Sequence, residues 1–152
     1  MAKIDLDNMN YTDLRNKDIR VRYISRLRTC HSPEKREEGF RKLIKFYLSG
    51  GNLGMTAYCY ELLGSLNKAC KYWAKNASKR IRSRKIGDFS DLDMDIDIAL
   101  THPDDINKTD MNIMINFLEK NKDRDIHTKF IYKKANKIYK AKSRRRKKNV
   151  RK

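Results

Sequence analysis

The chain of 152 residues has few of the residues that interrupt secondary structure, with only two prolines and six glycines. Lys, Glu, Leu, Met and Arg, which favour helices, are frequent. Hydrophobic residues make up 39% of the chain, which is low for a globular domain and indicates a small core. The composition therefore predicts a small, all-α protein.

Cysteine and long apolar runs are scarce as well. Cys30, Cys59 and Cys70 form an odd number and no Cys-x-x-Cys pair, which argues against a disulfide framework or a zinc site and predicts buried thiols. No uncharged apolar run approaches the roughly 18 residues that span a bilayer, and the amino end lacks the order of a secretory signal. We expect a soluble, cytoplasmic protein with no membrane partner.

Signals for a cofactor or a catalytic centre are also missing. No Gly-rich phosphate loop is present, because Gly50, Gly51 and Gly54 lack a following Lys-Ser/Thr pair. The histidines lie in separate segments without metal-ligand spacing. The sequence therefore predicts neither a metal ion nor another cofactor.

What the chain has in excess is positive charge, divided into three blocks. Residues 1–87 hold twenty bases and eight acids, residues 88–125 hold four bases and eleven acids, and residues 126–152 hold thirteen bases and no acid. The net charge is +18. Blocks this basic attract a polyanion, and the acidic block beside them can compete for the same surface. Nucleic acid is the first partner to consider, with DNA favoured over RNA.

Local signals place the first helices. Apolar spacing predicts one helix over residues 12–28. Ser32 as N-cap, Pro33 at the first helical position and the Gly50-Gly51 stop predict a second. Thr56 as a cap predicts a helical stretch to about residue 85, with a possible break at Gly64.

The later part of that stretch has two distinct faces. Apolar residues recur on one side, and bases recur every three or four residues on the other, over about 20 Å of helix. The apolar set is Leu66, Cys70, Trp73, Ala77 and Ile81, and the basic set is Lys68, Lys71, Lys75, Lys79 and Arg82. We expect a basic ridge that phosphate groups can contact.

The segment SDLDMDIDIAL, residues 90–100, alternates aspartates with apolar residues. A period of two is typical of a strand, but Asp is a poor strand residue, so we expect an extended acidic connector over 88–109. We expect its acids to lie near the basic ridge or tail and to weaken non-specific binding; they are Asp88, Asp91, Asp93, Asp95 and Asp97.

The same segment is similar to the metal-binding strand of nucleotidyltransferases, in which an Asp-x-Asp pair holds Mg²⁺. That family also has an upstream Gly-Ser, whereas this chain has Gly87-Asp88. We therefore do not expect an enzyme.

Two further helices are expected after the connector. Asp110 can cap a short helix, and a last helix begins near Arg124, so that residues 110–140 form a helical hairpin. Apolar residues nearly vanish after Ala141. Residues 141–152 should form a solvated basic tail that orders only on a polyanion.

Residues 40–75 carry a spacing that is typical of one family. Leu63-Gly64 is followed by Ala69 and Cys70 five and six positions after the glycine, and by Trp73 at nine. This pattern resembles the helix-turn-helix DNA-binding segments of phage and transposon regulators and small terminase subunits. The resemblance implies a positive φ at Gly64, packing of Cys70 and Trp73 against the preceding helix, and a second helix in the major groove. The alternative is an ordinary amphipathic helix with one glycine.

A second resemblance concerns the order of segments. The helix 57–76, the basic run RIRSRK, the acidic connector and two helices with a basic end are similar to the layout of small sigma factors. That resemblance implies binding to RNA polymerase as well as to DNA.

We expect a DNA-binding protein that acts in regulation or in genome packaging and that comes from a phage, a plasmid or a bacterium. We expect it in the cytoplasm, either associated with the nucleoid or in a virion. Its segments are 1–87, 88–109, 110–140 and 141–152. The alternative is a structural protein of a virion or ribonucleoprotein, which would bind nucleic acid without sequence preference. A homodimer is also possible, with the apolar faces of 111–118 and 126–139 as its interface. The expected contacts are Asn67, Lys68, Lys71, Lys75, Lys79, Arg80, Arg82, Arg84 and Lys85, and then Lys133, Lys137, Lys140, Arg144, Arg145, Arg146, Lys147 and Lys148.

Overall fold

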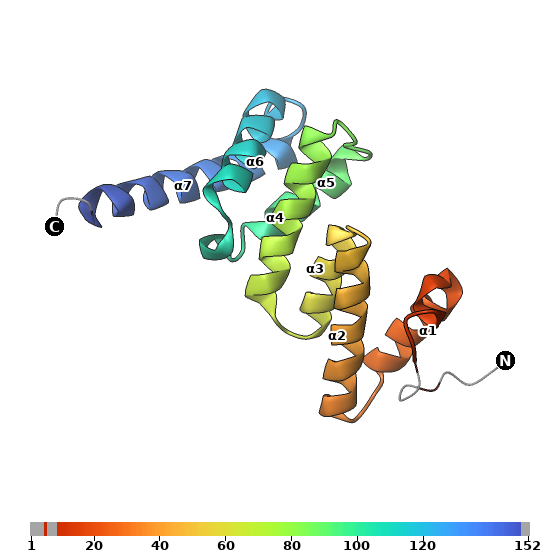
Figure 1. Cartoon of the computed structure of the whole chain (residues 1–152). Coiled ribbons are helices and arrows are strands. Elements are labelled where there is room, and N and C mark those ends of the chain that lie inside the picture. The colour runs from red at the N-terminus through yellow and green to blue at the C-terminus, as the bar shows by residue number, and fades with distance from the viewer. Residues whose placement is uncertain (1–4, 6–8, 150–152) are drawn as a thin grey trace. The chain divides into compact units, whose positions relative to one another are not determined.

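The computed structural model describes residue 5 and residues 9–149, and these residues form helices and no strand (Figure 1). This confirms the all-α prediction. The elements are η1 (Asp13–Arg15), α1 (Lys17–Arg28), α2 (Pro33–Ser49), α3 (Leu53–Leu62), α4 (Leu66–Arg82), α5 (Phe89–Ala99), η2 (Pro103–Asp105), α6 (Lys108–Asn121) and α7 (Ile126–Asn149).

The chain divides into two compact units, Met1–Ala69 and Cys70–Lys152, which we call the N-terminal and C-terminal units. The first turn of α4 belongs to the N-terminal unit and the rest of that helix to the C-terminal unit. The four segments expected from the sequence stay a prediction. Among the described residues we find no helix with the length and apolar character needed to cross a bilayer.

The N-terminal unit packs α1, α2 and α3 around Tyr23, Leu27, Phe40, Leu43 and Cys59, all fully buried. The capping prediction for α2 is confirmed, because the Lys35 backbone N–H donates to Ser32 Oγ at 3.4 Å and Pro33 opens the helix. Gly39 of α2 lies against α1, where a Cβ atom would approach Leu27 Cδ1 to 2.8 Å. A glycine is required there because the two helices pack so closely.

Two predicted helix starts are wrong by a few residues. The helix expected over 12–28 begins as the 3₁₀ turn η1, and Asn16 then caps α1 by accepting hydrogen bonds from two backbone N–H groups. Asn52, not Thr56, caps α3, and the Thr56 hydroxyl lies inside that helix and donates to the Asn52 carbonyl at 2.8 Å. In both cases an asparagine captures free N–H groups at the helix start.

The break expected at Gly64 is confirmed. Gly64 has a φ of +72°, the Ser65 N–H donates to the Tyr60 carbonyl at 2.9 Å, and the Gly64 N–H donates to the Glu61 carbonyl at 2.8 Å. This pair of bonds is the Schellman ending of a helix, which needs a left-handed residue at this position.

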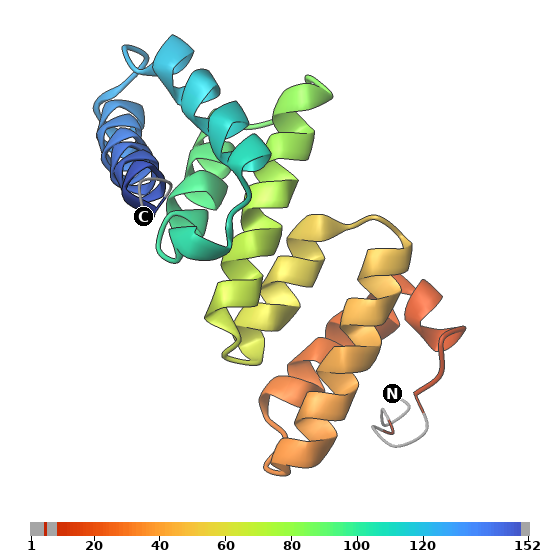
Figure 2. The ribbon, with the colours of Figure 1, turned by 60° about the vertical axis from the view of Figure 1, so that its left-hand side comes forward.

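The C-terminal unit packs α4 to α7 around one core. Buried residues come from all four helices, including Ala77 of α4, Ile96 of α5, Met114 of α6 and Ile131 of α7. In Figure 2, α5 and α6 lie between α4 and α7. Of the three cysteines expected to be buried, Cys59 and Cys70 are buried and Cys30 is only half-buried, and burial raises the pKa of the Cys59 thiol to about 12.

The prediction of an extended acidic connector is wrong, because residues 89–99 form the helix α5. Asp88 caps it by accepting a hydrogen bond from the Ser90 N–H at 2.7 Å. Leu92, Ile96 and Ala99 are spaced four and three residues apart and are fully buried. Apolar residues of the segment that alternates with aspartates in the sequence therefore also lie on one face of a helix.

Two further expectations for the carboxyl-terminal part need correction. Asn107 caps α6, and Asp110 lies at the third helical position, where its carboxylate accepts a hydrogen bond from the Asn107 side chain. The tail expected to be unstructured continues α7 as far as Asn149. Residues 150–152 of that tail lie outside the described residues.

Candidate nucleic-acid interface

The basic ridge of α4 lies on the side of the helix opposite the core of the C-terminal unit. Lys71, Lys79 and Arg82 are exposed, whereas Ala74 and Ala77 on the other side are fully buried. Lys75 is half-buried because its ammonium group lies 5.2 Å from the centroid of the Tyr72 ring. From Lys71 to Arg82 the ridge extends about 16 Å along the helix axis.

The ridge continues into the turn that ends α4. Arg84 and Lys85 are exposed, and Arg84 has a φ of +56°, the left-handed conformation that glycine usually supplies at a helix end. The Lys85 N–H donates to the Arg80 carbonyl at 3.1 Å, and the Arg84 N–H donates to the Ile81 carbonyl at 3.2 Å. This turn therefore holds an arginine where a smaller residue would be less strained.

Arg80 belongs to the inner side of α4 and not to the ridge. Its side chain is 22% exposed, and its guanidinium lies 3.0 Å from Asp95 Oδ2. The same guanidinium donates to the backbone carbonyls of Ile86 and Asp88. Arg80 thus ties α4 to the loop before α5, and its expected role as a phosphate contact does not fit these bonds.

Asn67 and Lys68 lie in the first turn of α4, within the N-terminal unit, and both are exposed. The ammonium group of Lys68 lies 5.7 Å from the centroid of the Tyr60 ring. An open groove of about 900 Å³ borders this turn, and its lining includes Arg36, Arg41, Lys45 and Lys68. The Arg36 guanidinium donates a hydrogen bond to the Leu62 carbonyl at 2.8 Å, and Arg41 forms an ion pair with Glu37 at 2.6 Å.

Cys70 and Trp73, which the helix-turn-helix resemblance expects to pack against the preceding helix, make contacts within the C-terminal unit. Cys70 Sγ lies 3.3 Å from the Ile98 carbonyl oxygen and 3.3 Å from Thr101 Oγ1, and Trp73 packs against the core of that unit. These contacts join α4 to the C-terminal helices.

The outer face of α7 carries a second row of bases. The row, which we call the α7 row, follows alternate steps of four and three residues. It begins with two apolar residues, Ile126 and Phe130, and continues with Lys133, Lys137, Lys140 and Arg144, all exposed. It lies opposite Ile131 and Ala135, which are fully buried. Arg145 is exposed beside the row. The backbone of Arg146, Lys147 and Lys148 is helical, and their side chains lie outside the described part of the structure.

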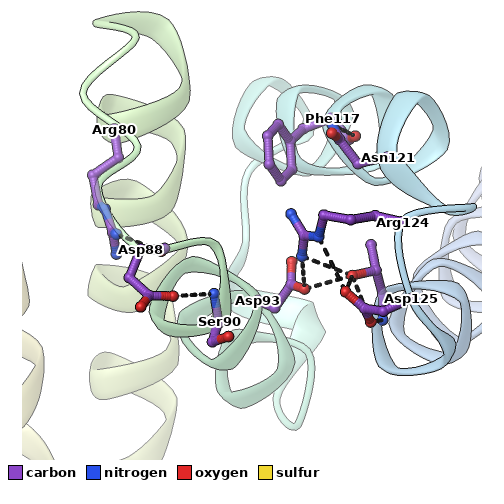
Figure 3. Close-up of polar contacts among 9 residues, drawn as sticks. Arg80, Asp88, Ser90, Asp93, Phe117, Asn121, Arg124 and Asp125 are labelled. Carbon is purple, nitrogen blue, oxygen red and sulfur yellow. Dashed lines mark hydrogen bonds and ion pairs between the residues drawn. The ribbon is translucent and has the colours of Figure 1, made fainter.

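The acidic block holds a different set of bases, namely Arg80, Arg124 and Lys134. Figure 3 shows Arg124 between Asp93 and Asp125. Its guanidinium contacts Asp93 Oδ2 and lies 3.0 Å from Asp125 Oδ2, 2.8 Å from Thr128 Oγ1 and 4.2 Å from the centroid of the Phe89 ring. Asp93 is 1% exposed. This network fastens the start of α7 to α5.

The pKa values of two of these acids shift in opposite directions. Burial raises the pKa of Asp95 above its usual value, although Arg80 and Asn76 partly oppose the shift. Hydrogen bonds from the Thr128 backbone and the Arg124 side chain lower the pKa of Asp125 to about 2. The pKa values of both acids are therefore set by their surroundings inside the C-terminal unit.

Three of the five acids expected to lie near the basic ridge or the tail are paired with bases of the C-terminal unit. Asp93 pairs with Arg124, Asp95 with Arg80 and Asp97 with Lys134, whose ammonium lies 2.6 Å from Asp97 Oδ1. Their expected effect on non-specific binding stays a prediction. Lys71 and Arg82 of α4 and the exposed bases of the α7 row have no ion pair in the described part of the chain, whereas Arg80 is paired with Asp95.

Other features of the surface were missed in the sequence. Arg22 and Arg26 of α1 are exposed one turn apart, within a stretch from residue 19 to 33 that contains no acid. Phe130 is 62% exposed and Ile126 is 89% exposed, both within the 126–139 face offered above as a homodimer interface. The acid-free stretch was a visible signal, whereas the exposure of Phe130 was not.

The Asp-x-Asp pair lies on α5, where Asp95 and Asp97 each contact a base. Within residues 9–149 we find no group of three or more His, Cys, Asp or Glu residues placed to hold a metal ion. Comparisons with protein-family models, with curated proteins and with solved structures found no match to this chain.

Proposed function

We propose that this protein binds nucleic acid, with DNA favoured, through phosphate contacts made by the outer faces of α4 and α7. One observation carries the proposal. Three aspartates of the acidic block are paired with Arg80, Arg124 and Lys134, while the exposed Lys71 and Arg82 of α4 and the exposed bases of the α7 row have no acidic partner in the described structure. Bases arranged in this way attract a polyanion.

The described exposed bases are numerous enough for strong electrostatic binding. On α4 and its final turn they include Lys71, Lys79, Arg82, Arg84 and Lys85, and on α7 they include Lys133, Lys137, Lys140, Arg144 and Arg145. If about six to ten of them meet phosphate, the affinity falls by about 10³ to 10⁵ between 50 and 200 mM salt. The release of counterions from the nucleic acid would supply most of the binding free energy.

The test uses three variants that each lose three positive charges. One changes Lys71, Lys79 and Arg82 to Gln, the second changes Lys133, Lys137 and Lys140 to Gln, and the control changes the exposed Lys17, Lys108 and Lys120 to Gln. Binding to a labelled duplex is titrated at several salt concentrations. We expect the first two to reduce the log–log salt slope by about 2.7 and the control to leave it near the wild-type value.

Two outcomes would remove the proposal: a wild-type salt slope near zero, or a control that loses as much affinity as the ridge variants. Competition with unrelated duplexes then separates two roles. A preference of about 10³ or more for one sequence indicates a regulator or a packaging protein. Equal affinity for all sequences indicates a structural component.

The helix-turn-helix resemblance adds a finer proposal, in which Asn67 reads a base edge and Lys68 a base or a phosphate. The positive φ of Gly64 supports it, and the packing of Cys70 and Trp73 counts against it. Replacing Asn67 by Ala should cost about 1–3 kcal/mol of discrimination at one base pair if it is correct.

A further inference from the structure

Two large apolar side chains begin the row of bases on α7. Ile126 and Phe130 are 89% and 62% exposed, and Met94 on α5, which packs against α7, is 53% exposed. Ionic attraction to phosphate does not account for them. An aromatic ring left open to solvent beside a row of lysines indicates a ligand that has both an apolar face and negative charge.

A second copy of the chain fits this face poorly. The steps of four and three residues are those of a coiled-coil seam, but Lys133, Lys137, Lys140 and Arg144 occupy four of its six positions. The sequence of α7 contains eleven bases and no acid. Two such faces in contact would bring like charges together over most of their length, and an apolar partner would leave the bases without counter-charge.

An unpaired nucleotide has both required parts. Its base offers a flat face to an aromatic ring, and its phosphate offers a negative charge to a lysine one helical turn away. Phe130 and Lys133 are three residues apart, about 4.5 Å along the helix axis, and the row then continues for about 16 Å to Arg144. In a duplex the bases stack on one another and present only their edges in the grooves.

We propose that Phe130 stacks on an unpaired base, so that the outer face of α7 contacts a base as well as phosphates where the nucleic acid is single-stranded. This assignment rests on the proposed function and adds a base contact to the phosphate contacts of α7. The α4 ridge offers no such contact, because its outward residues are all charged.

The experiment compares Phe130→Ala, Phe130→Leu and Phe130→Tyr with the wild type. The probes are a labelled 15-nucleotide oligothymidylate, the oligouridylate of the same length and a 15-base-pair duplex. The control is Val21→Ala, which shortens an apolar side chain that is 59% exposed on α1. Because residue 130 is exposed, the variants should keep their fold, which thermal melting checks.

We expect Phe130→Ala to weaken binding to the single strands by about 5- to 150-fold, the effect of losing one base–aromatic stack, with the salt slope unchanged. Phe130→Tyr should retain most of the affinity, Phe130→Leu should lose most of it, and duplex binding should change little. If oligouridylate and oligothymidylate respond alike, the contact is to the base face of either nucleic acid.

Several results would overturn the assignment. These are an unchanged single-strand affinity in Phe130→Ala, an equal loss for duplex and single strand, a Phe130→Leu variant that matches the wild type, or a dimer in sedimentation that Phe130→Ala dissociates. In each of these cases salt-dependent binding by the wild type would leave the proposed function standing. Wild-type protein that binds no oligonucleotide at low salt removes both.

Discussion

Arg80 on α4 and Asp95 on α5 form an ion pair in which the guanidinium lies 3.0 Å from Oδ2, and the side-chain amide of Asn76 donates to the same oxygen at 3.0 Å. The Asp95 side chain is only 8% exposed. One acid of the acidic block is therefore built into the packing of the C-terminal unit, next to the ridge that we assign to phosphate binding.

Replacing Asp95 by Ala should lower the free energy of unfolding by about 3 kcal/mol, because Arg80 is left partly buried without its counter-charge. Urea denaturation measures the loss. The exposed Asp91, one helical turn earlier, provides the control, since Asp91→Ala should change stability by less than about 0.5 kcal/mol. The double variant Arg80→Met/Asp95→Leu should recover much of the loss. Equal midpoints for Asp95→Ala and Asp91→Ala would show that the pair contributes nothing.

Gly39→Ala should destabilise the N-terminal unit although alanine is the better helix former by about 1 kcal/mol. The new methyl group would lie 2.8 Å from Leu27 Cδ1 and 2.9 Å from Tyr23 Oη, and both side chains are fully buried. Overpacking of this kind costs about 1–3 kcal/mol, so the net loss after the gain in helix propensity should reach up to about 2 kcal/mol. The control Lys45→Ala, on the exposed side of α2, should not destabilise the protein. A higher melting temperature for Gly39→Ala would refute the close contact.

Arg84→Gly should stabilise the C-terminal unit by about 1 kcal/mol while weakening nucleic-acid binding. The left-handed φ of +56° is unfavourable for arginine, and glycine removes that strain. Arg82→Gly loses the same charge from the last residue of α4, where glycine should cost about 1 kcal/mol instead. Thermal unfolding and a duplex titration of both variants should therefore give opposite changes in stability and similar losses of affinity. Changes of the same sign in stability would contradict the helix-end assignment.

Asp125 should contribute to the pH dependence of stability. Its carboxylate accepts a hydrogen bond from the Thr128 N–H at 2.7 Å, and its pKa falls from the usual 3.8 to about 2. Since the folded-state pKa is the lower one, this stabilisation is present above about pH 4 and is lost as the pH falls towards 2. Asp95, whose pKa is raised, acts in the opposite direction.

Asp125→Asn keeps a capping side chain that does not titrate in this range. The stability difference between wild type and Asp125→Asn, measured by urea denaturation between pH 5 and 2, should therefore shrink as the pH falls. A difference that stays constant over this range would mean that Asp125 has an ordinary pKa in the folded protein.

The sequence predicted well those elements whose signals are local. Ser32, Pro33 and Gly50 act within one helical turn of the ends of α2, so both its ends were correct. The pattern around α5 misled because Leu92 and Ile96 fit both a period of two and a helical face. What decides between them is the burial of Asp93 and Asp95, whose partners Arg124 and Arg80 lie 31 and 15 residues away in the chain. Such pairs are not visible in a local pattern.

For the candidate interface, periodicity predicted which side of each helix would be basic, but not which bases would be engaged. Lys79 and Arg80 are neighbours in the sequence, yet Lys79 is exposed and Arg80 is held by Asp95. Phe130 lies within the apolar face of 126–139 that was offered as a homodimer interface, and phenylalanine is usually buried. The helix turns it outward because Ile131 and Ala135 fill the core side of α7.

The α4 ridge and the α7 row are on the outer sides of two helices that share one core, so they point away from it in different directions. A molecule that binds phosphate on both could hold two separate stretches of a polymer at once. At a high ratio of protein to nucleic acid, such bridging would draw the polymer into condensed particles, whereas a protein with one cationic side would coat it as an extended filament.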